Sequence, residues 1–160
     1  METGKIETNL LLRGAIAGVA GGLAEIAWVT LYAAATGGNA ALLARGVTTA
    51  TGVDALFPAA AVEAGVTIHM GLAVLLGIAL SHAWHAYSER GGRARPYAFM
   101  LAALAGVWGI NFFVVLPLLH PAFIGLLPYA VSLVSKLLFG AAAAAVLRQR
   151  AGFTLAARRA

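Results

Sequence analysis

The sequence predicts an all-α integral membrane protein, a four-transmembrane-helix bundle with a short interfacial helix on its outer side. Hydrophobic residues make up 61% of the 160 residues and charged residues only 11%, whereas a soluble domain carries roughly 25% charged residues. Four segments each provide the roughly 20 mostly apolar residues that a membrane span needs. One membrane domain covering residues 1–160 is therefore expected.

The four spans are expected at about residues 10–36, 58–87, 97–119 and 123–147. The first span exceeds the length of a typical signal-peptide core and contains Glu25, so it is interpreted as a retained helix.

The connection at residues 37–57 is longer than the other two and only weakly polar. Asn39 is suited to cap a short helix that runs through Ala50. Leu42, Leu43 and Val47 on one side of that helix favour a position in the interface or over the end of the bundle.

The distribution of Lys and Arg indicates how the spans are oriented. Arg45 alone lies in the connections on one side, and Lys136 lies within a span. The other nine basic residues lie on the opposite side: Lys5, Arg13, Arg90, Arg93, Arg95, Arg148, Arg150, Arg158 and Arg159. Because such residues accumulate in cytoplasmic loops, both termini are expected in the cytoplasm. The net charge of +5 is attributed to this asymmetry, and no nucleic-acid partner is expected.

Each span carries one polar residue near the bilayer centre or in its outer half, namely Glu25, His69, Asn111 and Lys136. An ionisable group is costly in lipid, so these residues are candidates for function. A lone buried charge costs several kcal/mol, which favours a buried ion pair between Glu25 and Lys136. His69 and Asn111 are expected to supply hydrogen bonds around that pair.

Glu25 shares one face of the first span with Gly14, Gly18 and Gly21, at spacings of four, three and four residues. Small residues at such spacing let membrane helices pack closely, so Glu25 is expected on a buried seam. Two interpretations of the polar cluster stay open. It fixes helix register, as polar residues do in coiled coils, or it forms a site for a proton, an ion, a quinone head group or a cofactor.

Glu63 and His120 are expected near the outer ends of their segments, where together they would bind a cation or shuttle protons. A turn histidine that caps backbone groups is the alternative for His120. No metal site is predicted, and the chain has no cysteine to provide thiolate ligands. Membrane haem proteins of four helices pair histidines at matched depth, and His69 has no such partner. No cofactor is therefore predicted, although haem on His69 alone and quinone stay open.

The segment Gly106–Gly140 contains the patterns W-G-x-N, L-P-x-x-H-P-x-F, P-Y and S-K-L-L-F-G. With the glycine-rich Gly14–Gly22 and the His69–Met70 step, it resembles uncharacterised bacterial inner-membrane proteins of four spans. The resemblance implies the fold, a place in the bacterial inner membrane, and that Asn111, His120 and Lys136 belong to a shared pattern. It implies no reaction.

The sequence shows no phosphate loop, no HExxH motif and no nucleophile elbow, so no enzyme is predicted. The leading hypothesis is an accessory or interaction subunit of a membrane complex, with a respiratory or redox complex as one candidate. Its expected partners are the lipid bilayer and other membrane subunits or copies of itself. One alternative is a transporter or channel for protons or a small solute that uses Glu25, His69 and Lys136. The other is a haem- or quinone-binding electron-transfer subunit.

Overall fold

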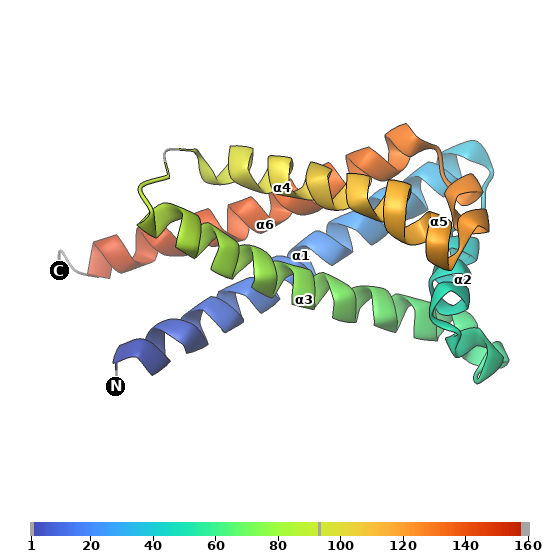
Figure 1. Cartoon of the computed structure of the whole chain (residues 1–160), viewed down its shortest axis with the longest axis horizontal. Helices are drawn as coiled ribbons and strands as arrows, with labels where there is room; N and C mark the ends of the chain where they lie inside the picture. Colours follow the sequence, from blue (N-terminus) through green and yellow to red (C-terminus); the bar gives the residue numbers. More distant parts are fainter. Residues whose placement is uncertain (1, 93, 158–160) are drawn as a thin grey trace.

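The computed structural model describes residues 2–92 and 94–157 and forms a bundle of long helices (Figure 1). No β-strand occurs within those residues. Four segments of this part of the chain are long and apolar enough to cross a membrane: Ile6–Thr36, Pro58–Glu89, Pro96–Leu119 and Tyr129–Arg148. The predicted all-α class and the four spans are confirmed at this level, and the length and composition of the helices mark a multi-pass membrane protein.

Three spans are single helices, and the third is composite. The single helices are α1 (Glu2–Thr36), α3 (Ala61–Glu89) and α6 (Tyr129–Ala157). The third span is built from α4 (Pro96–Ile110), the π-helix η3 (Asn111–Val115) and α5 (Leu116–Leu119). α1 begins and α6 ends at the same end of the bundle (Figure 1), as an even number of spans requires. Three of the basic residues used for orientation, Arg93, Arg158 and Arg159, lie outside the described residues.

The fourth span begins later than the sequence predicts. Residues expected to open it instead form the short 3-10 helix η4 (Pro121–Leu126), and α6 starts only at Tyr129. Pro128 stands directly before α6, and its carbonyl accepts the first-turn hydrogen bond from the Ser132 N–H. A proline has a fixed φ and no N–H, so it fits a helix start far better than a helix interior.

The predicted short helix between the first two spans is α2 (Ala40–Thr51). The Asn39 side chain accepts a hydrogen bond from the Ala41 N–H at 2.9 Å and caps its first turn. Gly52 ends the helix with φ of 74°, a left-handed conformation that glycine adopts without strain. Two 3-10 turns, η1 (Val53–Ala55) and η2 (Pro58–Ala60), then lead into α3. α2 lies across the end of the bundle opposite the chain termini (Figure 1).

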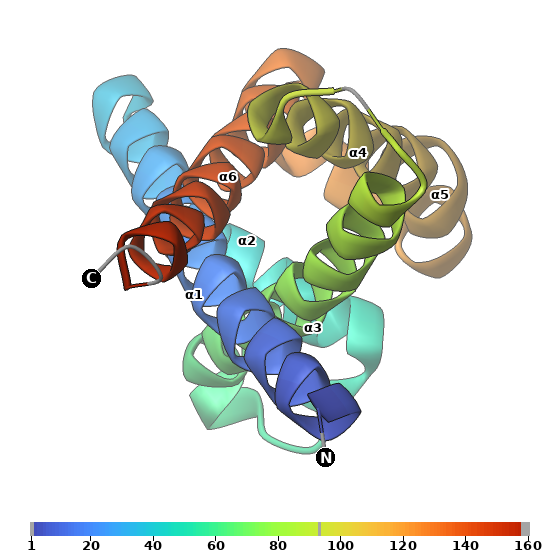
Figure 2. The same ribbon diagram turned by 90° about the vertical axis from the view of Figure 1, so that its left-hand side faces the viewer.

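The four spans are arranged around α1 and α6 rather than as a closed square. α1 packs extensively on α3 and on α6, and α4 packs on α6, whereas α3 and α4 make few contacts. Figure 2 shows the resulting ring of helices seen from the end where the chain terminates. The helices therefore pack in a row, α3 on α1, α1 on α6 and α6 on α4, and α3 and α4 at the two ends of that row make the fewest contacts with each other.

α1 and α3 approach so closely that their backbones touch. A Cβ atom on Gly18 would overlap the backbone of Ala73, and one on Gly77 would overlap the backbones of Gly14 and Gly18. Small residues allow such contact between membrane helices, where dispersion forces must replace the hydrophobic effect. Gly14 and Gly18, predicted on a packing seam, thus lie in the α1–α3 interface.

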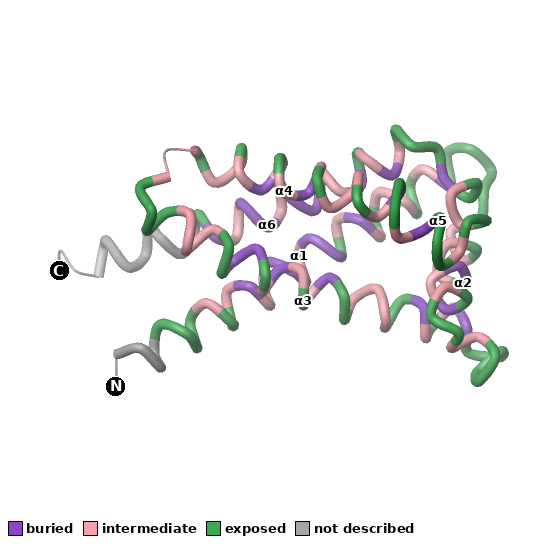
Figure 3. The backbone as a smooth tube through the Cα atoms, in the orientation of Figure 1, coloured by how far each residue is buried: buried purple, intermediate pink, exposed green. Residues whose placement is uncertain are grey.

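The most buried residues gather along the inner faces of α1, α3, α4 and α6 (Figure 3). Met100, Leu104 and Phe139 are completely buried and form the centre of this cluster. Many leucines on the outer faces are exposed, for example Leu23 and Leu75. An apolar exterior of this kind suits helices that are surrounded by lipid.

Candidate functional site

A buried ion pair joins α1 to α6. The Lys136 Nζ lies 2.7 Å from the Glu25 Oε1 and 3.0 Å from Oε2, so it contacts both carboxylate oxygens. Only 4% of the Glu25 side chain and 19% of the Lys136 side chain is exposed. Removing such charges from water is costly, and close pairing offsets part of that cost.

Residues one helical turn away hold this pair in position. Gly21 precedes Glu25 by one turn, and a Cβ there would lie 2.6 Å from the Phe139 ring. Phe139 follows Lys136 by one turn, and the Lys136 Nζ lies 5.8 Å from its ring centroid, within cation–π range. The glycine therefore lets the ring pack against α1 and sets the two charged side chains at the same level.

Two further side chains surround the Glu25 carboxylate. The Ser135 hydroxyl donates a long hydrogen bond of 3.4 Å to Oε1. The His69 Nε2, from α3, lies 3.6 Å from Oε2, which is beyond a good hydrogen bond. This Nε2 is buried and makes no hydrogen bond with the described part of the chain. The cluster thus brings together α1, α3 and α6, and it leaves one nitrogen unsatisfied.

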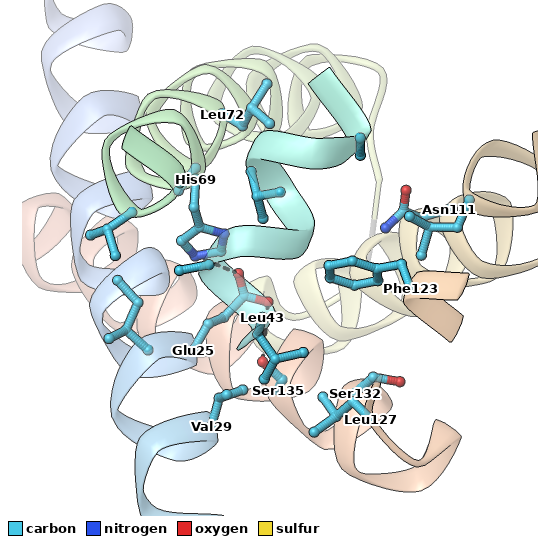
Figure 4. Close-up of a pocket in the computed structure, with 18 of the residues that line it drawn as sticks. Glu25, Val29, Leu43, His69, Leu72, Asn111, Phe123, Leu127, Ser132 and Ser135 are labelled. Atoms are coloured by element: carbon cyan, nitrogen blue, oxygen red, sulfur yellow. Dashed lines mark hydrogen bonds and ion pairs between the residues drawn. The ribbon is translucent and has the colours of Figure 1, made fainter. Parts of the chain in front are cut away.

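The cluster forms part of the wall of a cavity of about 540 Å³. α1, α2, α3, the third span and α6 all contribute to its lining (Figure 4). Most lining side chains are apolar, and the charged groups, Glu25 and Lys136, lie together with His69 and Ser135 beside them. α2 covers one end, where Gly65 of α3 packs directly on the backbone of Ala44.

Asn111 also lines this cavity, but it does not join the ion pair. Figure 4 shows it on a different wall from Glu25 and His69. Within the described residues, its side chain has no hydrogen-bond partner. The hydrogen bonds expected from His69 and Asn111 around the ion pair are not formed among the described residues: the His69 Nε2 stays 3.6 Å from the Glu25 carboxylate, and Asn111 lies on another wall. α4 packs mainly on α6 and meets α3 where the Phe99 ring packs on those of Trp84 and Tyr87.

Asn111 begins the π-helical turn η3, in which the Leu116 N–H donates to the Asn111 carbonyl. Pro117 follows immediately and has no N–H to donate to the Phe113 carbonyl in a regular helix. A π-turn inserts an extra residue and is frequent at functional sites. The proline was the sequence signal that could have indicated this irregular turn.

The two outer-side candidates remain apart. Glu63 is exposed in the first turn of α3, and His120 follows α5 with its ring 6.3 Å from that of Phe123. No hydrogen bond or ion pair joins them among the described residues. In the same part of the chain, no three His, Cys, Asp or Glu residues gather as a metal site would require.

Ser132 is a polar residue of the cavity wall that the sequence analysis did not place in the site. Its hydroxyl accepts a hydrogen bond from the Trp108 Nε1 at 3.0 Å and donates to the Tyr129 carbonyl at 2.9 Å. These bonds tie α4 to α6. Ser132 precedes Lys136 by four residues, so a helical projection of α6 places both on one face.

Fold and site define a class: a four-span membrane protein with a buried ion pair in the wall of a cavity between its helices. No family model, no curated protein and no solved structure matches the chain. The class is therefore stated from the geometry of this chain alone.

Proposed function

We propose that this protein binds a lipophilic molecule inside the membrane, in the cavity between its spans. The observation that carries this proposal is a cavity of about 540 Å³ whose mostly apolar wall includes one concentrated polar patch. Small-molecule sites are typically hollows of about 300–1,000 Å³ that combine apolar lining with a few placed polar groups. Binding of this kind agrees with the absence of any catalytic motif in the sequence.

The cavity meets the apolar exterior along α3 and the third span. Val66 and Leu72 of α3 and Leu119 of α5 line the cavity, yet they are 39%, 57% and 64% exposed. Since α3 and α4 make few contacts, packing does not close this side. A molecule dissolved in the bilayer would therefore enter sideways, without passing through water.

The rival interpretation is that the polar cluster has only a structural role, which is to hold helices together. The Glu25–Lys136 pair alone fits it well, because the pair joins α1 to α6. A structural role alone does not explain why the His69 Nε2 is buried without a hydrogen bond, because such burial costs free energy. It also gives no reason for the Asn111 amide to face a cavity. A ligand with hydrogen-bonding groups would account for both.

Filling the cavity tests the proposal. We expect the purified protein to retain a lipophilic molecule at about one per chain, detected by solvent extraction and mass spectrometry. Leu43→Trp, on the cavity side of α2, should abolish retention. Leu42→Trp is the matched control, because Leu42 lies outside the cavity lining and is 51% exposed. Equal retention by both variants, or none by the wild type, would refute the proposal.

The wider role we propose is that of an accessory subunit in the bacterial inner membrane, with both termini in the cytoplasm. The excess of Lys and Arg in the alternate connections and tails supports this orientation, and the likeness of Gly106–Gly140 to four-span inner-membrane proteins supports the location. Gentle solubilisation from the native membrane, followed by a mass measurement, tests it. A particle containing other subunits is expected, and an isolated monomer would refute the accessory role.

The composite third span favours transport of protons or a small solute as a second candidate. Transporters commonly place broken helices around a site at mid-membrane, and η3 interrupts the third span where Asn111 lines the cavity. Flux into liposomes should then fall in Glu25→Gln. Equal flux in this variant and the wild type would remove the ion pair from any transport role.

A haem-binding variant of the proposal depends on His69 alone. The visible spectrum of the purified protein tests it: a Soret band lost in His69→Ala would support haem, and a colourless preparation would exclude it.

A further inference from the structure

Some polar groups around the cavity already make hydrogen bonds within the protein, and others do not. Lys136 and Ser135 both donate to the Glu25 carboxylate. By contrast, the buried His69 Nε2 has no hydrogen-bond partner among the described residues, and the partly exposed Asn111 side-chain amide makes no hydrogen bond with them either. These two free groups belong to α3 and to the third span, on different walls of the cavity (Figure 4).

The charges of the wall cancel. Glu25 and Lys136 form a pair in contact, so the wall carries no net charge to attract an ionic head group. An anionic oxygen bound to the His69 Nε2 would also lie near the Glu25 carboxylate, which is 3.6 Å from that nitrogen. Like charges at such separation repel strongly in a poorly solvated site. A cationic head group would meet the Lys136 ammonium in the same way, so the wall favours a neutral one.

Three aromatic residues belong to the cavity wall, namely Phe112 of η3, Phe123 of η4 and Phe139 of α6. Phe112 and Phe139 are buried, at 5% and 0% exposed, so the partly exposed Phe123 is the one that presents its ring to the cavity. Aromatic rings attract one another in offset-stacked or edge-to-face geometry, so the Phe123 ring suits a planar ring better than a flexible chain.

We propose that the ligand is a lipophilic quinone, whose neutral ring carries carbonyl oxygens at opposite ends. In the neutral tautomer protonated at Nε2, His69 donates to one oxygen, and the Asn111 amide donates to the other. The Phe123 ring packs on the quinone ring, and the apolar tail leaves between α3 and α5, past Leu72. This inference rests on the proposed function, and it concerns binding only; no electron transfer is part of it.

The test is a titration of the purified full-length protein in detergent with four probes that share a ten-carbon tail. The probes are an alkyl benzoquinone, the alkylbenzene that lacks its oxygens, a fatty carboxylate and an alkyl trimethylammonium. Calorimetry should give a Kd for the quinone at least tenfold below that of every other probe. Leu43→Trp should abolish this binding, and Leu42→Trp should preserve it.

Variants at the two free groups test the assigned contacts. His69→Phe and Asn111→Leu should each weaken quinone binding about tenfold and leave alkylbenzene binding unchanged, since a lost neutral hydrogen bond costs about 1–2 kcal/mol. His69→Gln keeps a donor and should recover part of the affinity. Thermal unfolding of each variant shows whether it remains folded.

The outcomes separate this inference from the proposed function. If the alkylbenzene binds as tightly as the quinone, or both variants leave quinone affinity unchanged, the quinone assignment is overturned. If a charged probe binds tightest and only Leu43→Trp abolishes its binding, the cavity remains a lipophilic site for another ligand. If no probe binds in a way that depends on Leu43, both proposals fail.

Discussion

The two long sides of α3 are packed in opposite ways. On the side facing α1, Gly77 lies against the backbones of Gly14 and Gly18, with no room for a single added carbon. On the side facing the third span, Val66 and Leu72 line a cavity of about 540 Å³ and remain partly exposed. One helix therefore has a side in backbone contact with its neighbour and a side that is left partly open.

The difference follows from which helices hold α3 and α4. α3 packs mainly on α1 and α4 mainly on α6, and the two make few contacts with each other. The cavity therefore results from the sequence in which the helices pack on one another, α3 on α1, α1 on α6 and α6 on α4. The same helix thus packs at backbone distance on α1 and leaves a cavity toward the third span.

The largest expected effect is at the tight seam. Gly77→Leu should destabilise the protein by more than the roughly 3 kcal/mol of ordinary overpacking, because its side chain would overlap the backbone of α1. Gly71→Leu, on the same helix, is the control, since a Cβ at Gly71 meets nothing within 4 Å. Unfolding by SDS in mixed micelles measures both. Equal stabilities would show that the seam is not as close as described.

The ion pair should give the next largest effect. Lys136→Ala leaves the Glu25 carboxylate buried without its partner, and we expect a loss of about 3 kcal/mol. The double variant Glu25→Ala with Lys136→Ala removes the stranded charge and should be more stable than the single one. The same SDS titration compares them. If the single and double variants unfold alike, the two side chains do not depend on each other.

The sequence was sufficient to predict the features that depend on local pattern. Hydropathy located the four spans. The N-cap Asn39 correctly predicted where α2 begins, and Gly52 ends that helix. Glu25 and Lys136 were the natural pair, since they are the only acidic and the only basic residue near the middle of their spans. Opposite charges that must leave water together constrain each other strongly.

The sequence did not predict the features that depend on the distance between helices. Asn111 shares a helical face with Trp108 in projection, yet only Trp108 reaches α6, through Ser132. The π-turn beginning at Asn111 changes the register of the third span, and a regular helical projection does not include it. The cavity likewise arises from the sparse contact between α3 and the third span, which no single segment encodes.

The smallest expected effect separates two polar residues of the cavity wall. Ser132→Ala leaves the Trp108 Nε1 without its acceptor and should cost about 1–2 kcal/mol of unfolding free energy. Asn111→Leu breaks no hydrogen bond with a described residue and should change that free energy by less than about 0.5 kcal/mol. The SDS titration measures both variants against the wild type. A loss at Asn111 as large as that at Ser132 would mean that its amide fastens the bundle. A stable Asn111→Leu protein would instead mean that the amide is free to serve a ligand, because its removal costs the fold nothing.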